Sequence, residues 1–465
     1  MDDRAYRESA LSRRTLLGMA SMAALGAASC GGSDESGPAH PSVRSEAGTI
    51  AKDAYVFGFP LVLMDLARIA AEASTPVGRF EHAASLPTAA QRNLARPDPD
   101  TLHSTAWLDL ADEPMVLSVP VMDGGRFWLA QLLDAWTNNV HNPSSIRPQA
   151  APPHTYVVTG PAWSGALPEG LTPMPMPTPT AWLIVRVQVD GAKDIPAVRS
   201  LQQRLRLVPL SAWSAGVEPS TSAPPGGRSG GQRPVDQVMG MDAHEFFDRM
   251  CALLAVDPPA PEDEPAMRRF ATIGIRPGGA VEGISDAELT AAADTVKQQL
   301  PVTLGANTTN DNGWVSDLGA GRYGTNYLLR AVTAFGALGI PLPEDAHHLF
   351  TAVQAGSGPF RLHFVSGELP PVDAFWSLAV YDAGDYLVPN PAEIYSIGHH
   401  VPVVLNADGF LDLTLQHDDP GPGVPEGNWL PIPESDPFSV TLALFAPKAA
   451  VLQRRWQPPP LIALR

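Results

Sequence analysis

The chain has 465 residues, with 49 acidic against 31 basic side chains and a formal net charge of -18 at pH 7. A surface this negative repels phosphate backbones, so we expect no nucleic-acid partner. The length exceeds what one hydrophobic core usually supports, and the 49 prolines, about twice average usage, favour turns and short strands. The composition therefore predicts two domains rich in β-structure.

The N-terminus has the pattern of a signal peptide. Residues 12–17 read SRRTLL, a twin-arginine motif, and an alanine-rich apolar stretch continues to Leu25. This stretch is too short to cross roughly 30 Å of hydrocarbon, so it indicates an address for export rather than a membrane span. We predict a signal peptide over residues 1–30 and a flexible tether over residues 31–45.

Cys30 ends the segment LGAASC, which has the small residues of a lipoprotein processing box. We therefore expect an exported protein of the cell envelope, lipid-anchored at Cys30 and otherwise secreted. Contact with the membrane would be through this anchor only. Cys251 is the only other cysteine, so acylation of Cys30 would leave no intramolecular disulfide.

Residues 46–213 form the first predicted domain. An apolar, helix-like run over residues 47–68 opens it, and Gly58 and Pro60 interrupt this run. Between residues 96 and 191 short apolar runs are bounded by Gly, Pro, Asp and Asn, which is typical of strands in a sandwich or barrel. The runs are TLHSTAWLDL, PMVLSVP, FWLAQLLDAW, HTYVVTGPAW and TAWLIVRVQVDG.

A linker rich in Gly, Pro and Ser follows over residues 214–234. Residues 235–350 form a helical segment, in which AHEFFDRMCALLAV and ISDAELTAAADTVKQQL have helical apolar spacing and Ser285 is suited to cap the second helix. Residues 351–465, with part of the helical segment, form the second β-sandwich domain. Within it, residues 410–417 and 438–446 alternate as strands with one wetted face.

Two glycine-rich patterns resemble functional motifs. Residues 227–231 fit G-x-S-x-G, but a nucleophile elbow needs a strand before it and a helix after it, and this pattern lies in the linker. Residues 319–324 fit G-x-G-x-x-G, but no βαβ unit surrounds them. A glycine turn before a helix is the better interpretation of the second pattern.

Asp98, Asp100 and His103 lie close together in the sequence and offer ligands that suit several divalent ions. The alternative is a proline-rich turn into a strand, with the Asp side chains capping backbone amides. The adjacent histidines at 347–348 and 399–400 lack helical ligand spacing. We therefore predict no metal site and no cofactor.

Several longer blocks carry a family resemblance. LLDAWTNNV, GRYGTNYLLR, NWLP and the stretch GELPPVDAFWSLAVYDAGDYLVPNPAEIYSIG resemble a bacterial family that pairs domain of unknown function 1254 with domain of unknown function 1214. The resemblance implies two mostly β, sandwich-like domains with accessory helices, an α+β fold whose C-terminal half is jelly-roll-like. It implies no activity. The chain departs from the family pattern at Asp98, His103 and Ile394, where Asn, Tyr and Arg are usual.

Three functions remain open. The first is an exported protein that binds or processes a small organic or carbohydrate-like ligand between the two domains. Flat aromatic faces and neutral amides suit such a ligand, and an arginine could grip an anionic one. The candidates are Trp136, Asn138, Asn139, Arg147, Tyr395 and Trp429. The third possibility, besides the enzyme described in the next paragraph, is a structural role in the cell envelope.

The second function is a hydrolase or lyase with carboxylate and histidine acid–base chemistry, for which Asp100, His103 and Asp134 are the catalytic candidates. Strand ends and their loops collect at the rims of a sandwich. We therefore expect one pocket near the domain interface, with Tyr395 or Trp429 closing it from the second domain. Its members would be Asp100, His103, Asp134, Asn138 and Arg147, unless Arg147 and Asp134 simply pair across a loop.

Replacing Arg13 and Arg14 by Lys should leave the precursor in the cytoplasm, because the export receptor reads the arginine pair. Cys30→Ser should separately move the exported protein from the membrane fraction to the soluble fraction, because the acyl chain would be lost. Cell fractionation with immunoblotting measures both effects. Normal export of the double-lysine variant would exclude the twin-arginine route.

Overall fold

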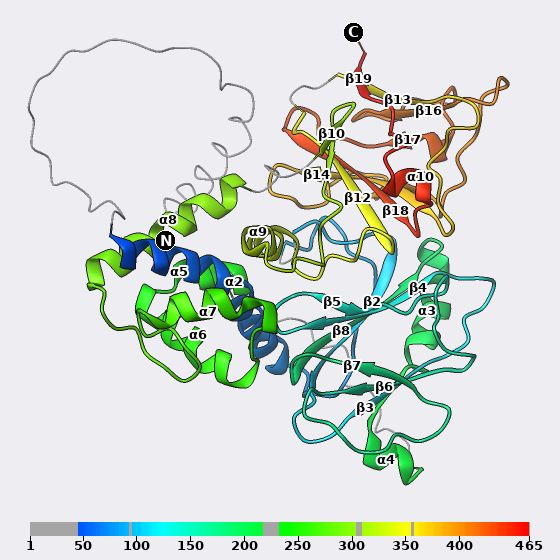
Figure 1. Ribbon diagram of the computed structural model, residues 1–465. Helices are drawn as coiled ribbons and strands as arrows, with labels where there is room; N and C mark the ends of the chain where they lie inside the picture. The colour runs from blue at the N-terminus through cyan, green and yellow to red at the C-terminus, as the bar shows by residue number, and fades with distance from the viewer. Residues whose placement is uncertain (1–44, 93–94, 217–231, 304–308, 355–357, 465) are drawn as a thin grey trace, which may run out of the picture.

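The computed structural model describes residues 45–92, 95–216, 232–303, 309–354 and 358–464. In these ranges the chain forms two β-sandwiches, one above the other on the right of Figure 1, with a group of helices on the left. This is the predicted mostly β, α+β fold with sandwich-like domains. The signal peptide, Cys30 and most of the linker lie outside the described residues.

The N-terminal sandwich consists of a five-stranded and a four-stranded sheet. In the first sheet β2 and β4 flank β8 and pair with it antiparallel, and the apolar residues of one face pack onto the second sheet. The five strands, in spatial order, are β1 (Glu81–His82), β2 (Thr101–Asp109), β8 (Thr180–Gln188), β4 (Trp128–Asp134) and β5 (Asn139–His141). The four are β7 (Thr172–Pro175), β6 (His154–Thr159), β3 (Met115–Val119) and β9 (Arg206–Pro209).

The C-terminal sandwich consists of a six-stranded and a four-stranded sheet around a core of Leu, Val and Phe side chains. The six strands, in spatial order, are β10 (Thr309–Asp311), β11 (Trp314–Ser316), β12 (Ala346–Thr351), β18 (Phe438–Phe445), β14 (Trp376–Asp382) and β15 (Ser396–Gly398). The four are β17 (Trp429–Leu430), β16 (Leu411–Leu415), β13 (Phe360–Phe364) and β19 (Leu461–Ala463). Strands β10 to β12 thus bring part of the predicted helical segment into this domain.

Helices α5 to α9 pack around α2 (Glu46–Glu72), which runs without interruption through Pro60, contrary to the expected break. Gly58 allows α6 to approach, since a Cβ atom there would lie 2.3 Å from the Met250 sulfur. By length and composition α2 could span a membrane, but 61% of its most apolar window is buried. The other helices are α3 (Ile195–Gln202), α4 (Leu210–Ser214), α5 (Pro234–Gly240), α6 (Ala243–Val256), α7 (Glu264–Ala271), α8 (Asp286–Thr303), α9 (Tyr327–Ala337) and α10 (Ala449–Leu452). Ser285 caps α8 as predicted, accepting a hydrogen bond from the Glu288 amide at 3.3 Å.

The two sandwiches meet through the outer face of the five-stranded sheet. Phe127 and Leu129 of the first sandwich form an apolar cluster with Phe375 and Phe445 of the second. The rings of Phe375 and Phe445 stack with their centroids 4.1 Å apart. Strand β18 is therefore buried along its whole length, and the wetted face predicted for it is wrong. The prediction holds for β16, whose residues alternate between buried and half-buried.

At Gly321 the segment before α9 comes into close contact with strand β5. Its φ is +86°, and an added Cβ would lie 2.4 Å from Asn139 Nδ2 and 2.8 Å from Leu342 Cδ2. The Asn139 amide also donates to the Gly321 carbonyl at 2.8 Å. The glycine pattern at 319–324 therefore forms a turn and a packing contact, and the prediction of a glycine turn before a helix is confirmed.

Gly321→Ala should lower the free energy of unfolding more than Gly313→Ala. Both glycines have φ +86°, but a Cβ on Gly313 meets no atom within 4 Å, so backbone strain is matched and only the clash differs. Overpacking costs about 1 to 3 kcal/mol, and we expect a difference in this range in urea denaturation. Equal losses in the two variants would show that the contact relaxes freely.

Candidate functional site

The segment from Arg96 to Asp100 crosses from the first sandwich onto the second. The Arg96 guanidinium donates to Thr441 Oγ1 and to Ser439 Oγ on β18, each at 2.9 Å. The Tyr381 hydroxyl on β14 donates to the Pro97 carbonyl at 2.9 Å. The chain then begins β2, so the acidic residues of this segment lie at the interface of the two domains.

The Asp98 carboxylate is held by three groups from its own segment. Oδ1 accepts from the Asp100 amide at 2.8 Å, and Oδ2 accepts from Thr101 Oγ1 at 2.5 Å. Oδ2 also lies 3.2 Å from Nε2 of His103. Burial raises the pKa of Asp98, but His103 and the other hydrogen bonds outweigh burial and hold this pKa well below its ordinary value.

Solvent reaches this pair, because the side chains of Asp98 and His103 are 20% and 29% exposed. In the described part of the chain no hydrogen-bond partner contacts Nδ1 of His103. An imidazole oriented by a carboxylate through one nitrogen can use the other nitrogen to accept or donate a proton. His103 also stands directly opposite Arg186 on β8, on the sheet face that turns toward the second sandwich.

Asp100 turns away from this pair and into the second sandwich. Its side chain is only 2% exposed, and the hydroxyls of Ser377 on β14 and Ser396 on β15 donate to its two oxygens, Ser396 at 3.0 Å. Burial, followed by the charge of Asp98, raises the pKa of Asp100 to about 7, against the effect of the serine hydrogen bonds.

His399 and His400, directly after β15, complete this interface. Nε2 of His399 lies 3.0 Å from the Val189 carbonyl oxygen of the first sandwich. Nδ1 of His399 lies 3.8 Å from Oδ1 of Asp100. The sequence predicts no role for this histidine pair, because adjacent histidines lack the ligand spacing of a helix.

Asp134 does not join Asp100 and His103. It pairs with Ala181 at one end of β8, whereas Thr101, next to Asp100, pairs with Gln188 at the other end. Seven residues of extended chain separate these two positions, which corresponds to about 23 Å. The single pocket expected from the sequence is therefore not formed.

Asp134 instead closes the turn after β4. Its Oδ1 accepts from the backbone amides of Trp136 at 2.9 Å and Asn138 at 2.8 Å, and Oδ2 accepts from Asn138 Nδ2 at 2.8 Å. Both oxygens of Asp134 are therefore hydrogen-bonded, and the side-chain NH2 of Asn138 is used by Asp134. The pair satisfies buried backbone donors, which is a structural role.

The other ligand candidates lie apart and are engaged in packing or hydrogen bonds. Arg147 pairs with the nearly fully buried Asp345 rather than with Asp134. Asn139 Nδ2 donates to the Ile340 carbonyl at 3.1 Å, and the Trp429 indole donates to the Gln416 carbonyl at 3.0 Å. Tyr395 packs against a small apolar cluster near β14.

Trp136 is covered by a residue that sequence analysis missed. Arg330 on α9 is 2% exposed, and its guanidinium lies 5.0 Å from the Trp136 ring centroid and 5.2 Å from that of Phe57. Trp136 itself is 2% exposed, and its indole donates to the Pro258 carbonyl at 3.2 Å. A cation already occupies the aromatic face that a ligand would need.

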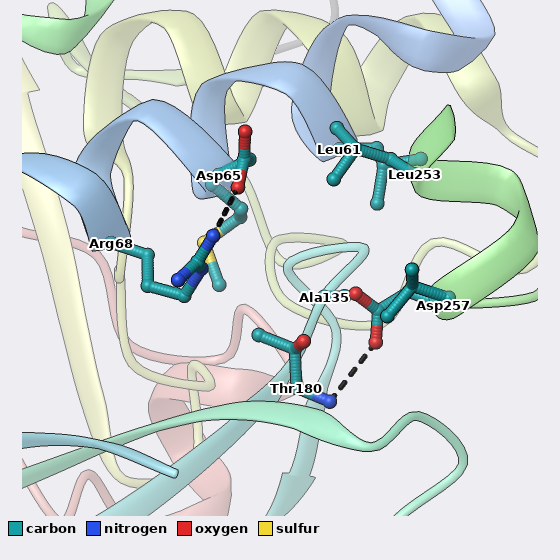
Figure 2. Close-up of a pocket in the computed structure, with 9 residues that line it drawn as sticks. Leu61, Asp65, Arg68, Ala135, Thr180, Leu253 and Asp257 are labelled. Carbon is teal, nitrogen blue, oxygen red and sulfur yellow. Dashed lines mark hydrogen bonds and ion pairs between the residues drawn. The ribbon is translucent and has the colours of Figure 1, made fainter. Parts of the chain in front are cut away.

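A separate cavity of about 110 Å³ lies between α2, the end of α6 and the start of β8 (Figure 2). Its polar side chains are partnered: Asp65 pairs with Arg68 and Arg249 at 2.7 Å each, and Asp257 accepts from the Thr180 amide at 3.0 Å. Because these side chains already have partners, they have little hydrogen-bonding capacity left for a ligand. The interface around residues 98–103 is the stronger candidate.

The sequence profiles of two domains match the chain in succession, each described as a protein of unknown function. DUF1254 matches residues 77–209, and DUF1214 matches residues 351–449. The chain therefore contains these two domains in tandem. The resemblance seen in the sequence is thereby confirmed, and residues 98–103 belong to the DUF1254 part, whereas His399 and His400 belong to the DUF1214 part.

One solved structure shares this fold. The VPA0106 protein from Vibrio parahaemolyticus superposes with a TM-score of 0.66 at 19% identity, over 90% of this chain and 100% of that chain, which shows a common fold. An uncharacterised protein from Burkholderia cenocepacia reaches a TM-score of 0.42 at 11% identity, over 86% of this chain and 90% of that chain. No curated protein matches the chain.

Asp134→Asn should change how stability depends on pH. Burial raises the pKa of Asp134 from 3.8 to about 6, so the folded protein holds this proton more tightly than the unfolded chain. The resulting stabilisation is complete below pH 4 and is lost as pH rises through 6. A shift of about two units corresponds to about 3 kcal/mol.

The free energy of unfolding of Asp134→Asn should therefore increase relative to that of wild type as pH rises. Urea denaturation from pH 4 to 8 measures this difference. Asp112→Asn, at an exposed position, is the control. A difference between wild type and Asp134→Asn that stays constant over this pH range would contradict the raised pKa.

Proposed function

We propose that this tandem of DUF1254 and DUF1214 is an exported acid–base enzyme, a hydrolase or lyase acting on a small organic molecule at the domain interface. The Asp98–His103 pair would be its catalytic dyad. Asp98 would hold the imidazole through Nε2, and Nδ1 of His103 would take a proton from water or substrate and return it to the leaving group.

One observation carries this proposal: a carboxylate and an imidazole 3.2 Å apart, oriented by two further hydrogen bonds, remain reachable from solvent at the interface. A surface pair of the same kind, His363 and Asp412 at 2.7 Å, joins two neighbouring strands of one sheet in the second sandwich. Active sites commonly lie at domain interfaces, where both domains can shape the substrate site.

Ligand binding by the aromatic and amide candidates has less support than the acid–base enzyme. Trp136 is covered by Arg330, Asn138 is used by Asp134, and Trp429 is hydrogen-bonded to the backbone of Gln416. Export rests on the twin-arginine motif and Cys30, so the site would act in the cell envelope, on molecules that reach that compartment.

The test is turnover by the full chain of a panel of small esters, glycosides and substrates of elimination reactions. Asp98→Asn and His103→Gln should each lower the rate on any active substrate by about a hundredfold or more, the usual contribution of acid–base groups. The melting temperature of His103→Gln should change little, because this side chain is partly exposed. Asp98→Asn should lower it modestly, because the ionised carboxylate accepts three hydrogen bonds, and circular dichroism checks that this variant is folded.

His363→Gln is the matched control, since it breaks the surface imidazole–carboxylate pair and should leave the rate at the wild-type value. A rate that survives His103→Gln would exclude the dyad. Absence of turnover on the whole panel would favour a structural role in the envelope.

A further inference from the structure

His399 is buried with one ring nitrogen unsatisfied. Its side chain is 5% exposed and packs on the Phe375 ring with centroids 4.1 Å apart. Nε2 lies 3.0 Å from the Val189 carbonyl oxygen, and because a carbonyl only accepts, Nε2 must carry hydrogen. Nδ1 of the neutral ring is then a lone-pair acceptor, and it has no hydrogen-bond partner in the described part of the chain.

This lone pair faces another acceptor. Oδ1 of Asp100 lies 3.8 Å from Nδ1 of His399, which is too long for a hydrogen bond. The serine hydroxyls of β14 and β15 already donate to Asp100 from other directions. Two buried acceptors that face each other across a gap are unfavourable unless a positive charge lies between them.

His400 supplies a third atom that could bind a metal ion. One ring nitrogen of His400, one of His399 and a carboxylate oxygen of Asp100 all lie within 4.8 Å of one another. We propose that Asp100, His399 and His400 bind one divalent transition-metal ion of the zinc type. Two imidazoles and a carboxylate suit such ions, and three protein ligands leave a coordination position for water or substrate.

The distances are compatible with one ion. Metal–nitrogen and metal–oxygen bonds of about 2.0 to 2.2 Å place two ligand atoms about 3 to 4 Å apart. The 3.8 Å gap between His399 and Asp100 already lies in this range, and the 4.8 Å limit on the set requires only a small rotation of a side chain such as His400, which is half-buried.

The surrounding contacts are those that orient metal ligands. A ligating histidine usually donates its other ring N–H to a carbonyl or carboxylate, as His399 does to Val189, and ligating carboxylates are themselves hydrogen-bonded, as Asp100 is by Ser377 and Ser396. Asp100 and Val189 belong to the first sandwich and the histidines to the second. The ion would therefore join the two domains.

A proton is the competing explanation, because an imidazolium of His399 could pair with the Asp100 carboxylate, or a protonated Asp100 could donate to Nδ1 of His399. The 3.8 Å separation of Nδ1 and Oδ1 disfavours such a proton, because it is too long for the hydrogen bond that the proton would form. The two explanations differ in a direct measurement, since only the metal site takes up an ion in a fixed ratio.

The full chain, stripped with a chelator, should bind Zn²⁺ with a stoichiometry near one in isothermal titration calorimetry. Its melting temperature should rise with Zn²⁺, because the ion binds the folded interface only. Co²⁺ should give the visible absorption of a nitrogen- and oxygen-ligated site. A chain that binds no ion stoichiometrically would overturn the proposal.

His399→Ala, His400→Gln and Asp100→Asn should each weaken Zn²⁺ binding at least tenfold and remove the shift in melting temperature. His363→Ala, which breaks the surface pair with Asp412, should bind as wild type. So should His103→Ala, which removes the proposed dyad but no proposed ligand; this variant separates failure of the metal site from failure of the acid–base function.

Circular dichroism establishes that each variant is folded. Should the fully buried positions fail this check, the half-buried His400 decides, because His400→Gln removes a ligand at the edge of the set. Stoichiometric binding that His400→Gln and His399→Ala leave unchanged would place the ion elsewhere and overturn the assignment.

Discussion

The two sandwiches are held in one relative position by a short polar segment that must cross between them with every group satisfied. An unpaired buried acid costs several kcal/mol, so Asp100 can be buried only where the second sandwich offers partners. The Arg96 guanidinium is 28% exposed and needs such partners for its inner nitrogens only. The second sandwich offers them on two adjacent strands, β18 for Arg96 and β14 for Asp100. Sliding one sandwich by a single residue pair would leave both charges without these hydrogen bonds.

This constraint also explains why β18 could not be interpreted from its sequence alone. Ser439 and Thr441 alternate with apolar residues, and the alternation correctly indicates two different faces. The polar face meets the Arg96 guanidinium rather than water, and farther along the strand Ala443 and Phe445 belong to the apolar cluster between the domains. Periodicity shows that a face is distinct, but it contains no information on what covers that face.

The same limit separates the parts of the site that the sequence revealed from those it did not. The turn at Asp98 was foreseeable, because its partners Asp100, Thr101 and His103 lie within five positions of it. The separation of Asp134 from His103 depends on the register of β8, and the approach of His399 to Asp100 depends on how the domains meet. Both are long-range, and no local pattern encodes them. The helix across Pro60 is similar, because burial against the other helices outweighs the lost hydrogen bond.

Asp98 and Asp100 finally show how one short segment can support two different chemistries. Their contacts point in different directions: Asp98 keeps its charge beside His103, whereas Asp100 meets two serine hydroxyls and the imidazoles of His399 and His400. The charge of Asp98 makes ionisation of Asp100 harder, and this effect is reciprocal in a low-dielectric interface. A positive charge next to Asp100, whether a proton or a metal ion, therefore helps to keep Asp98 ionised and able to orient His103. The buried acid and the exposed pair are one electrostatic unit, although the sequence presents them as a single acidic turn.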